Sequence, residues 1–393
     1  MNSLTLPVAL RDAANQVFQK LTFLLFPKTG SVIQLLRGSP GEILVLRTGN
    51  IGDIACAIPA LAALRKNFPR ARLCLLTSPG LRGLPEAGEV LEGLGLVDEI
   101  ITFFQSDLGS PLFLAGLIRT LRQHQVDLFV YLNQNITSFS RQLRDLCFAS
   151  FIGAKGAFGF ALAHHFPLFD PRKLKDYIPG QNEVERLLGI LGQFGINSDS
   201  AYKVALPEES LRFAERLLDP FSKNGPRPVI GFQVSAKADA NLWPLSKVAD
   251  LCVRLNADFS PLFLFTGSPG ERENLLQLCQ SIPGEKLVAA GEATVLESLA
   301  LISRCQVFVS LDTGPIHLAA LTGIPIVGLY SARQFKKMWE PDAQNAVVLR
   351  KDVPCELCFQ LTCDHLSCME AITVDEVYNA VVKQLSLKTD QYN

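Results

Sequence analysis

Two glycine-containing turns carry the residues of this sequence that are best suited to chemistry. The first lies in residues 47–61, RTGNIGDIACAIPAL, directly after an apolar run at residues 43–46. Its Asp53 stands where a helix is expected to begin, so the carboxylate can either cap that helix or act as a general base. The positive end of the helix dipole should lower its pKa and keep it ionised.

The second turn lies in residues 307–320, VFVSLDTGPIHLAA, where an apolar strand ends at Asp312. Thr313 is a good N-cap, and Pro315 fits the first helical turn because that position needs no N–H. Free N–H groups at such a helix start suit a phosphate or diphosphate, and His317 is near enough to donate a hydrogen bond. The alternative is a simple strand–turn–helix junction, in which Asp312 closes an Asx-turn and His317 is a half-buried histidine.

The apolar pattern around these turns alternates short strands with amphipathic helices in each half of the chain. This βαβ rhythm predicts parallel sheets with helices on both faces, and therefore an α/β fold of two doubly wound domains that face each other across a cleft. A helix is expected at residues 54–67. Strands are expected at residues 43–47, 72–77, 99–103, 127–132, 229–234, 262–266, 286–290, 307–311 and 324–329.

The domain boundaries follow from a polar, proline-containing stretch at residues 206–228, which interrupts the rhythm and is typical of a linker. Near the C-terminus, Thr373 and Glu376 can form a capping box and so predict a terminal helix. The chain is then expected to comprise an N-terminal extension, two Rossmann-like domains and a C-terminal helix, at residues 1–40, 41–205, 206–372 and 373–393.

The N-terminal extension is basic and strongly apolar along one face. Apolar residues recur at helical spacing, at Val17, Phe18, Leu21, Leu24 and Leu25. Two interpretations remain open: a helix packed on the body of the protein, and a basic amphipathic helix lying on an anionic membrane surface. No apolar run reaches the ~18–20 residues that span a bilayer, and the first residues lack the pattern of a signal peptide.

The overall composition is that of a globular protein with large cores. Of 393 residues, 48% are hydrophobic and 19% are charged, and the formal net charge is −1. A chain without excess basic charge is not expected to bind nucleic acid.

The ten cysteines fall into two groups. Six are scattered through apolar segments and indicate buried thiols in a reducing compartment, at positions 56, 74, 147, 252, 279 and 305. The other four form C-x2-C-x4-C-x4-C, at Cys355, Cys358, Cys363 and Cys368. Four thiols could complete a structural zinc site, but there is no second C-x2-C pair, so reduced structural thiols are the first interpretation, zinc the second and disulfides the last.

Taken together, the two turns resemble the two signatures of glycosyltransferase family nine, the ADP-heptose:lipopolysaccharide heptosyltransferases. The first signature is matched by R-T-x-x-x-G-D-x-x-x-x-x-P-A-L and the second by S-L-D-T-G-P-I-H-L-A-A. Further matches occur in the family's order, at residues 182–186, 234–235, 243–244, 265–267, 368–369 and 372–373. The resemblance covers residues 41–385.

This resemblance implies a GT-B fold, in which the first domain holds the acceptor, the second binds the nucleotide-sugar and the terminal helix crosses back to the first domain. It implies inverting transfer of heptose from ADP-heptose to a lipopolysaccharide-core acceptor, with no cofactor and no metal in the chemistry. The implied location is cytoplasmic, at the cytoplasmic face of the inner membrane if residues 1–40 bind there.

The resemblance also implies roles for individual residues. Asp53 matches the catalytic base, and the diphosphate would lie on the N–H groups of Thr313, Gly314 and Ile316 and the Thr313 hydroxyl, with Asp312 bonding sugar hydroxyls. Further donor contacts are assigned to Ser235, Lys237, Glu292 and His317. Acceptor or sugar contacts are assigned to Thr48, Gly49, Asn50 and Gly52, where the glycines let the sugars approach the backbone. Two alternatives stay open: Lys237 as an exposed lysine, and Glu292 as a solvated surface acid.

The chain departs from the family's pattern at two positions. Asn241 stands where a basic residue commonly precedes the Trp-Pro pair, and Cys56 stands where several heptosyltransferases have histidine. The alternatives to heptose transfer are a transferase of the same fold with another sugar or acceptor, and a non-catalytic nucleotide-sugar-binding protein. A nicotinamide dehydrogenase is disfavoured because Gly49-Asn50-Ile51-Gly52 does not form G-x-G-x-x-G.

Overall fold

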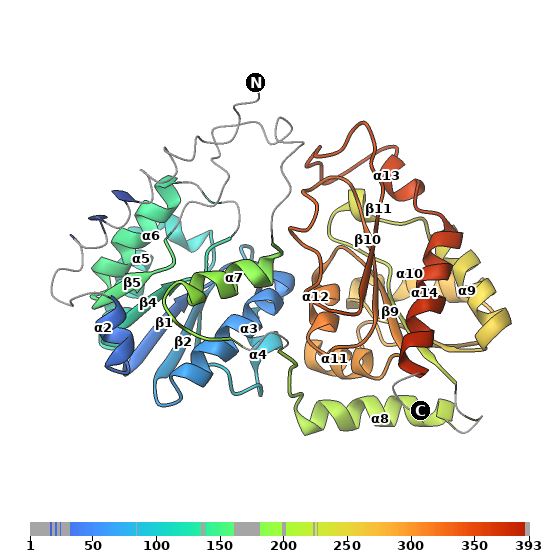
Figure 1. Cartoon of the computed structure of the whole chain (residues 1–393), viewed down its shortest axis with the longest axis horizontal. Coiled ribbons are helices and arrows are strands. Elements are labelled where there is room, and N and C mark those ends of the chain that lie inside the picture. The colour runs from blue at the N-terminus through green and yellow to red at the C-terminus, as the bar shows by residue number, and fades with distance from the viewer. Residues whose placement is uncertain are drawn as a thin grey trace. The chain divides into compact units, whose positions relative to one another are not determined.

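In the computed structural model, the chain forms two compact units (Figure 1). The first comprises residues 1–176 and 183–200, and the second comprises residues 177–182 and 201–393. The structure describes residues 16–17, 20–21, 24 and 32–389, except residues 84, 135–136, 138, 161–180, 199–201, 223–224 and 226. Each unit is built on one parallel β-sheet with helices around it.

The first domain contains a five-stranded sheet in the order β3-β2-β1-β4-β5. Its strands are β1 (Glu42–Leu46), β2 (Arg72–Thr77), β3 (Glu99–Thr102), β4 (Leu128–Tyr131) and β5 (Gly156–Phe158). Its helices are α2 (Val32–Arg37), α3 (Ile51–Asn67), α4 (Ala87–Leu91), α5 (Pro111–Gln123), α6 (Phe139–Phe151) and α7 (Glu183–Gly192), with a 3-10 turn η1 (Asp107–Gly109). The last helix, α7, returns to pack beside α3 (Figure 1).

The second domain contains a six-stranded sheet in the order β11-β10-β9-β6-β7-β8. Its strands are β6 (Val229–Gln233), β7 (Leu262–Phe265), β8 (Glu285–Val288), β9 (Val307–Leu311), β10 (Ile326–Tyr330) and β11 (Ala346–Arg350). Its helices are α8 (Glu208–Ser222), α9 (Leu245–Phe259), α10 (Arg272–Gln280), α11 (Val295–Ser303), α12 (Gly314–Ala320), α13 (Ser367–Glu370) and α14 (Val374–Thr389), with η3 (Asp239–Asn241) and η4 (Pro269–Glu271).

The central strands are buried on both faces, which explains their continuous apolar sequences. Strand β1 pairs in parallel with β2 and β4, so Val45 lies between Leu75 and Val130. In the second sheet, β9 lies between β6 and β10, with Val309 beside Phe232 and Val327. Helices on both sides shield these strands from water, and the expected α/β class follows from that arrangement.

Two details of the domains differ from the helix and strand bounds that the sequence pattern predicted. Helix α3 begins at Ile51 rather than at residue 54, because Asn50 is its N-cap residue. The edge strands β5 and β11 were not expected. Strand β5 has only three residues, and β11 is half-buried along its length, so neither gives a strong pattern of burial.

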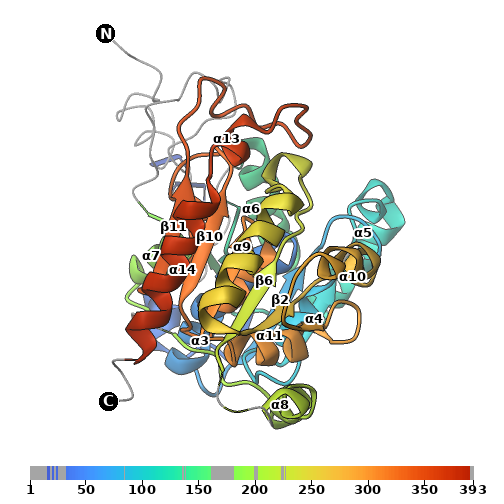
Figure 2. The same cartoon turned by 90° about the vertical axis from the view of Figure 1, so that its right-hand side faces the viewer.

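The C-terminal helix α14 belongs to the second unit. Its buried residues Val377 and Val381 join the core of the second domain, and its expected crossing to the first domain stays a prediction. Figure 2 shows α14 alongside α9, and the two helices are in contact. The segment before α14 is tied to the same domain, because the Trp243 indole donates to the Ile372 carbonyl at 3.1 Å.

The expected amphipathic helix at residues 1–40 lies mostly outside the described residues. Of its apolar positions, Leu21 is half-buried and packs against the core of the first domain, whereas Val17 and Leu24 are exposed. Among the helices that the structure describes, none is long and apolar enough to cross a membrane.

Candidate functional site

Asp53 is the third residue of α3, and both of its carboxylate oxygens have partners. Oδ2 accepts a hydrogen bond from the backbone N–H of Asn50 at 3.0 Å, which ties the acid to the start of its own helix. Oδ1 lies 3.1 Å from Nη2 of Arg47. The capping interaction expected as one alternative is therefore present, and it coexists with an ion pair to Arg47, which directly follows β1.

Arg47 is fully buried and joins Asp53 to a second acid far along the chain. Its Nη1 donates to Glu183 Oε1 and to the Asn133 carbonyl oxygen, both at 2.9 Å. Arg186 lies on the other side of Glu183, with its Nη2 2.7 Å from Oε1. The result is a buried network of two cations and two acids, which begins at Asp53 and ends on α7.

The opposite charges of this network stabilise the ionised forms of its side chains. Burial alone would raise the pKa of Glu183, but the hydrogen bonds and charges of Arg186 and Arg47 outweigh it and lower that pKa. Burial would lower the pKa of Arg47, and the charges of Glu183 and Asp53 raise it instead. Asp53 therefore lies beside a permanently charged guanidinium that cannot rotate away, because the other side of that guanidinium is also bonded.

Gly49 is required by Asp53 itself. Its φ is +134°, and a Cβ at this position would lie 2.2 Å from the Asp53 Cγ. The expected reason for glycine here was close approach of substrate to the backbone. The structure gives another reason: the absent side chain leaves the space that the Asp53 carboxylate occupies.

A cavity of about 560 Å³ opens in the first domain beside this turn. Helices α5 and α6 contribute apolar walls, which include Leu114, Leu117, Ile118, Phe148 and Phe151. Polar groups lie at the strand ends and on α6, among them Asn133, Arg141 and Arg144. Of the predicted first-turn contacts, Thr48, Gly49 and Asn50 line the cavity, whereas Gly52 lies within α3 and is not among its lining residues.

The second turn starts the short helix α12, with Thr313 in the N-cap position. The Thr313 side chain makes no capping hydrogen bond, so its hydroxyl is not used in the way that the sequence suggested. The Ile316 N–H donates to the Thr313 carbonyl oxygen at 3.2 Å. Ile316 is thus a poor candidate for a diphosphate contact, and the N–H groups of Thr313 and Gly314 are the better ones.

His317 points into the second domain rather than to its surface. Its side chain is buried, and its ring lies edge-on to Trp339 with 6.0 Å between the ring centroids. This placement fits the structural interpretation of His317, and a contact with a ligand stays a prediction.

Asp312 directly follows β9 and is half-buried. Burial raises the pKa of its carboxyl group to about 7, against the opposing charge of Arg333. Its backbone carbonyl accepts a hydrogen bond from Asn241 Nδ2 at 3.0 Å, and Asn241 Oδ1 accepts another from the Ser331 hydroxyl at 2.6 Å. Asn241, the position where the chain departs from the family's basic residue, is buried and links the ends of β9 and β10.

The remaining residues that were predicted to contact the nucleotide-sugar donor lie nearer the surface. Ser235 is half-buried, and its hydroxyl accepts a hydrogen bond from Gln233 Nε2 at 2.7 Å. Lys237 is exposed. Glu292 is exposed and forms an ion pair with Arg272, which also donates to the Ala290 carbonyl oxygen at 2.9 Å. These positions agree with the surface interpretations of Lys237 and Glu292 and leave their ligand contacts as predictions.

The C-terminal cysteines are free thiols at different depths. Cys355 is exposed, Cys358 and Cys363 are half-buried, and Cys368 joins the core of the second domain. Within the part of the chain that the structure describes, a group of three His, Cys, Asp or Glu ligand atoms lying within 4.8 Å of one another occurs only in the first domain, and these cysteines are not in it. A structural zinc ion at residues 355–368 stays a prediction.

Sequence reasoning assigned no role to Arg47, Asn133, Glu183 and Arg186, although they fix the candidate base. A signal for Arg47 was present, because a charged residue directly follows a wholly apolar strand that is expected to be buried. Its partner is 136 residues away and cannot be identified by spacing.

Comparison with known proteins gives the family. The model of glycosyltransferase family 9 (heptosyltransferase) matches residues 114–368, which is more than half of the chain and includes parts of both domains. The chain belongs to glycosyltransferase family 9. This family 9 member is therefore a glycosyltransferase, as the two turns predicted.

The relatives of this family 9 glycosyltransferase are distant. It is 26% identical over 314 residues to lipopolysaccharide heptosyltransferase 3 of Escherichia coli, covering 75% of this chain and 85% of the relative. A family 9 glycosyltransferase structure from Veillonella parvula matches with a TM-score of 0.67 and 21% identity, over 88% of this chain and 97% of that one. The structure of E. coli ADP-heptose lipopolysaccharide heptosyltransferase II matches with a TM-score of 0.63 and 19% identity, over 88% and 99%. These structures confirm the GT-B fold class.

Proposed function

We propose that this glycosyltransferase transfers heptose from ADP-heptose to a lipopolysaccharide-core acceptor, with inversion at the anomeric carbon. The observation that carries the proposal is the placement of Asp53, which the buried Arg47 holds at the first turn of α3, three residues after the cavity-lining Asn50. The family match and the names of the relatives, which include heptosyltransferases that act on lipopolysaccharide, support the sugar and the acceptor.

In the proposed reaction, Asp53 accepts the proton of the acceptor hydroxyl. Hydrogen bonds from Asn50 and Arg47 hold its two carboxylate oxygens in place. The acceptor oxygen then forms a bond to the anomeric carbon while the bond from that carbon to the diphosphate breaks, and ADP leaves. The ion pair with Arg47 fixes the direction of the carboxylate, so little reorganisation is needed when the proton moves.

The second domain would bind the donor. The N–H groups of Thr313 and Gly314, with the Thr313 hydroxyl, are proposed to bind the diphosphate, with Ser235 and Lys237 on its other side. Asp312 is proposed to bind sugar hydroxyls. Because Asn241 fixes the Asp312 backbone to Ser331, it acts as a positioning residue for this turn.

The first domain would bind the acceptor in the cavity beside Asp53. A lipopolysaccharide core is anionic and attached to a lipid, and the cavity combines the guanidinium group of Arg141 with the apolar walls of α5 and α6, while Arg144 is ion-paired with Asp145 at 2.7 Å. This pairing of positive charge with apolar surface fits an acceptor of that chemistry.

The test is to follow ADP release when the full chain is incubated with ADP-heptose and a core-truncated lipopolysaccharide. We expect the natural chain to release ADP. The Asp53→Asn variant should lose this turnover while it still binds the donor. Asp98→Asn is the matched control, because Asp98 also forms an ion pair with an arginine, Arg65, in the same domain. If Asp53→Asn keeps full turnover, Asp53 is not the base.

Two further outcomes separate the alternatives. In the first, the chain turns over another nucleotide-sugar but releases no ADP from ADP-heptose with any heptose-deficient acceptor. This result would keep the reaction class and refute the heptose assignment. Binding of ADP-heptose without turnover on any acceptor would favour a non-catalytic nucleotide-sugar-binding protein.

A further inference from the structure

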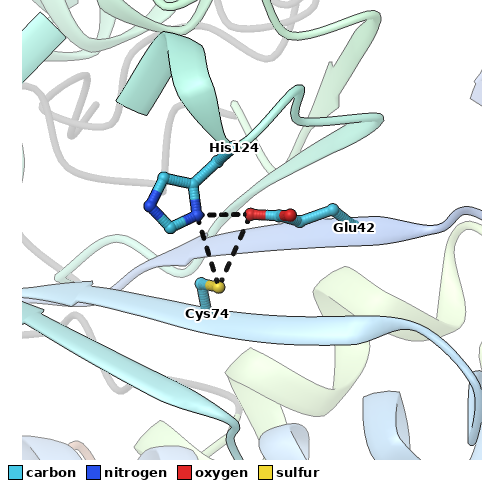
Figure 3. Close-up of side chains that lie close together, drawn as sticks. All are labelled: Glu42, Cys74 and His124. Carbon is cyan, nitrogen blue, oxygen red and sulfur yellow. Dashed lines mark hydrogen bonds and ion pairs between the residues drawn. The ribbon is translucent and has the colours of Figure 1, made fainter. Parts of the chain in front are cut away.

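We propose that Glu42, Cys74, Glu99 and His124 form a zinc-binding site at the amino end of the first sheet. Figure 3 shows three of these side chains converging from different elements. The site is separate from the proposed catalytic site, because Glu42 begins β1 whereas Asp53 follows the other end of that strand. The inference therefore does not depend on the sugar or the acceptor.

The four side chains meet because of strand register. Cys74 of β2 pairs with Leu44 of β1, two residues after Glu42, so Glu42 and Cys74 are diagonal neighbours on the same face of the sheet. Glu99 of β3 lies directly opposite Cys74 on the other side. His124 is the C-cap residue of α5 and places its ring over this face.

The distances between the donor atoms suit a tetrahedral site. Cys74 Sγ lies 3.6 Å from Glu42 Oε1 and 4.0 Å from Glu99 Oε2. His124 Nδ1 lies 4.0 Å from Cys74 Sγ and 4.0 Å from Glu99 Oε2. Zinc bonds of about 2.0–2.3 Å place ligand atoms roughly 3.3–3.8 Å apart in a tetrahedron, so the donor atoms of Glu42, Cys74 and His124, which lie within 4.8 Å of one another, need to move by less than about 1 Å. Glu99 lies outside this group of three and would complete the tetrahedron by turning toward the ion.

One pair of atoms is closer than a zinc site requires. His124 Nδ1 lies 2.7 Å from Glu42 Oε1, which is a hydrogen bond. Metal binding would replace the proton of this bond and the thiol proton of Cys74, as zinc sites generally do. The competing explanation is that the histidine and the acid form only a hydrogen-bonded pair beside a protonated thiol, and the experiment below is designed to separate the two.

The donor set identifies the class of metal. A thiolate and an imidazole bind zinc well, whereas calcium and magnesium prefer sites made of oxygen alone. Cys74 is fully buried, and Glu42 and His124 are mostly so, which protects the bonds from competing water. Arg72 forms an ion pair with Glu99 at 2.6 Å, but more than half of the Arg72 side chain is exposed, so the metal can displace it at little cost.

The role of such a site would be structural. It would add bonds between β1, β2, β3 and the end of α5 to the strand pairing and the apolar core that already join these elements. A metal that binds the folded chain and not the unfolded chain stabilises the fold by mass action. Zinc should therefore raise the unfolding temperature of the first domain.

The test uses Co²⁺ and Zn²⁺ with the full chain carrying Cys355→Ser and Cys358→Ser, so that the C-terminal C-x2-C pair cannot contribute. We expect one equivalent of Co²⁺ to bind, with a thiolate-to-cobalt charge-transfer band and the intense visible bands of a tetrahedral ion, and Zn²⁺ to displace it. Cys74→Ser should remove the charge-transfer band and weaken binding by at least about 100-fold.

Two variants serve as controls. His124→Gln keeps a donor for Glu42 but supplies no imidazole, so it should fold normally and lose the tetrahedral spectrum. Cys305→Ser is the matched thiol control, because Cys305 is a buried cysteine of the second domain whose Sγ donates to the Leu301 carbonyl oxygen, as a serine hydroxyl can. It should leave binding unchanged.

The proposal is overturned if the double serine variant binds neither ion. It is also overturned if Cys74→Ser and His124→Gln keep the spectrum and the affinity, since the ion then lies elsewhere. If His124→Gln loses its fold, the Cys74→Ser variant alone decides the outcome.

Discussion

Arg47 Nη2 lies 3.1 Å from Asp53 Oδ1, while Nη1 of the same guanidinium lies 2.9 Å from Glu183 Oε1. The buried cation thus connects the start of α3 to α7 and holds the carboxylate of Asp53 in one orientation. An ion pair of this kind costs desolvation energy, so its presence is better explained by orientation of Asp53 than by stability alone. In the proposed reaction, a base held in place before substrate arrives needs little reorganisation.

Replacing Arg47 with methionine should strongly destabilise the first domain. Glu183 would remain buried beside Arg186 alone, and breaking a buried ion pair by removing one partner costs about 3–5 kcal/mol. Urea unfolding followed by circular dichroism checks the expected loss. The tryptophans, Trp243 and Trp339, lie in the second domain, so an unchanged fluorescence transition would show that the effect is confined to the first.

The double variant Arg47→Met with Glu183→Gln should recover part of this loss. The glutamine has no charge to leave unpaired, so the double variant should be more stable than Arg47→Met by about 1–3 kcal/mol. Additive effects of the two substitutions would contradict the direct coupling inferred from the 2.9 Å contact.

Glu183 also predicts a pH dependence of stability. Its pKa is lowered in the folded chain, so its contribution is present above the unfolded pKa of about 4.3 and is lost as the pH falls through the lower folded value. Unfolding free energies of the natural chain should therefore decrease below about pH 4.3, and those of Glu183→Gln should decrease less. Equal slopes for the two proteins in this acid range would refute the assignment.

The part of this site that sequence alone could predict is the part made by neighbouring residues. Asp53 and Gly49 belong to one turn, and the strand before it is apolar throughout, so the turn and its acid follow from local pattern. The contact from Arg47 to Glu183 spans 136 residues and depends on α7 returning to pack beside α3, which no periodicity encodes. The same limit applies to Asn241. Its residue type showed that the chain departs from the family's pattern at this position, but not which groups its side chain contacts.

Local pattern also assigned some hydrogen bonds wrongly. Thr313 occupies the expected N-cap position but makes no side-chain cap, and Ile316 gives its N–H to the Thr313 carbonyl. Capping preference predicts where a helix starts, but the backbone angles of one turn decide which N–H groups point outward. The φ of Thr313 is −158°, an extended conformation that the sequence does not specify.

Gly49→Ala should displace the Asp53 carboxylate. Its main effect should be a loss of turnover, with a smaller effect on the free energy of unfolding. An alanine Cβ would lie 2.2 Å from the Asp53 Cγ, so the carboxylate must leave its place beside Arg47. We expect a loss of turnover of about 100-fold or more. Gly83→Ala is the matched control, because Gly83 also has positive φ, at +83°, but its added Cβ would meet no atom within 4 Å. Similar losses in both variants would indicate backbone strain rather than displacement of Asp53.

Asn241→Ala should weaken donor binding without touching the donor directly. The Ser331 hydroxyl and the Asp312 carbonyl would each lose a buried partner, at a cost of about 1–3 kcal/mol to the second domain. Tryptophan fluorescence measures that cost, and titration with ADP measures affinity for the donor's nucleotide. An Asn241→Ala chain that is destabilised but binds ADP normally would show that the residue supports the fold only.

Asp312 predicts a pH dependence opposite in sign to that of Glu183. Burial raises its pKa to about 7, so its stabilising contribution is complete below the unfolded pKa of about 3.9 and is lost as the pH rises through 7. Asp312→Asn removes this loss, because the amide cannot ionise. The variant should match the natural chain near pH 5 and be more stable at pH 8, by about 1–2 kcal/mol after allowance for partial exposure to water.

Tryptophan fluorescence during urea unfolding at pH 5 and pH 8 measures this difference in the domain that contains Asp312. Asp239→Asn is the control, since Asp239 is an exposed acid of the same domain and its replacement should change stability equally at both pH values. If Asp312→Asn gains nothing at pH 8, the ionised carboxylate is well solvated in the folded chain. A gain would mean that the natural chain retains an acid that destabilises it above pH 7, as expected when a side chain is kept for binding a ligand rather than for folding.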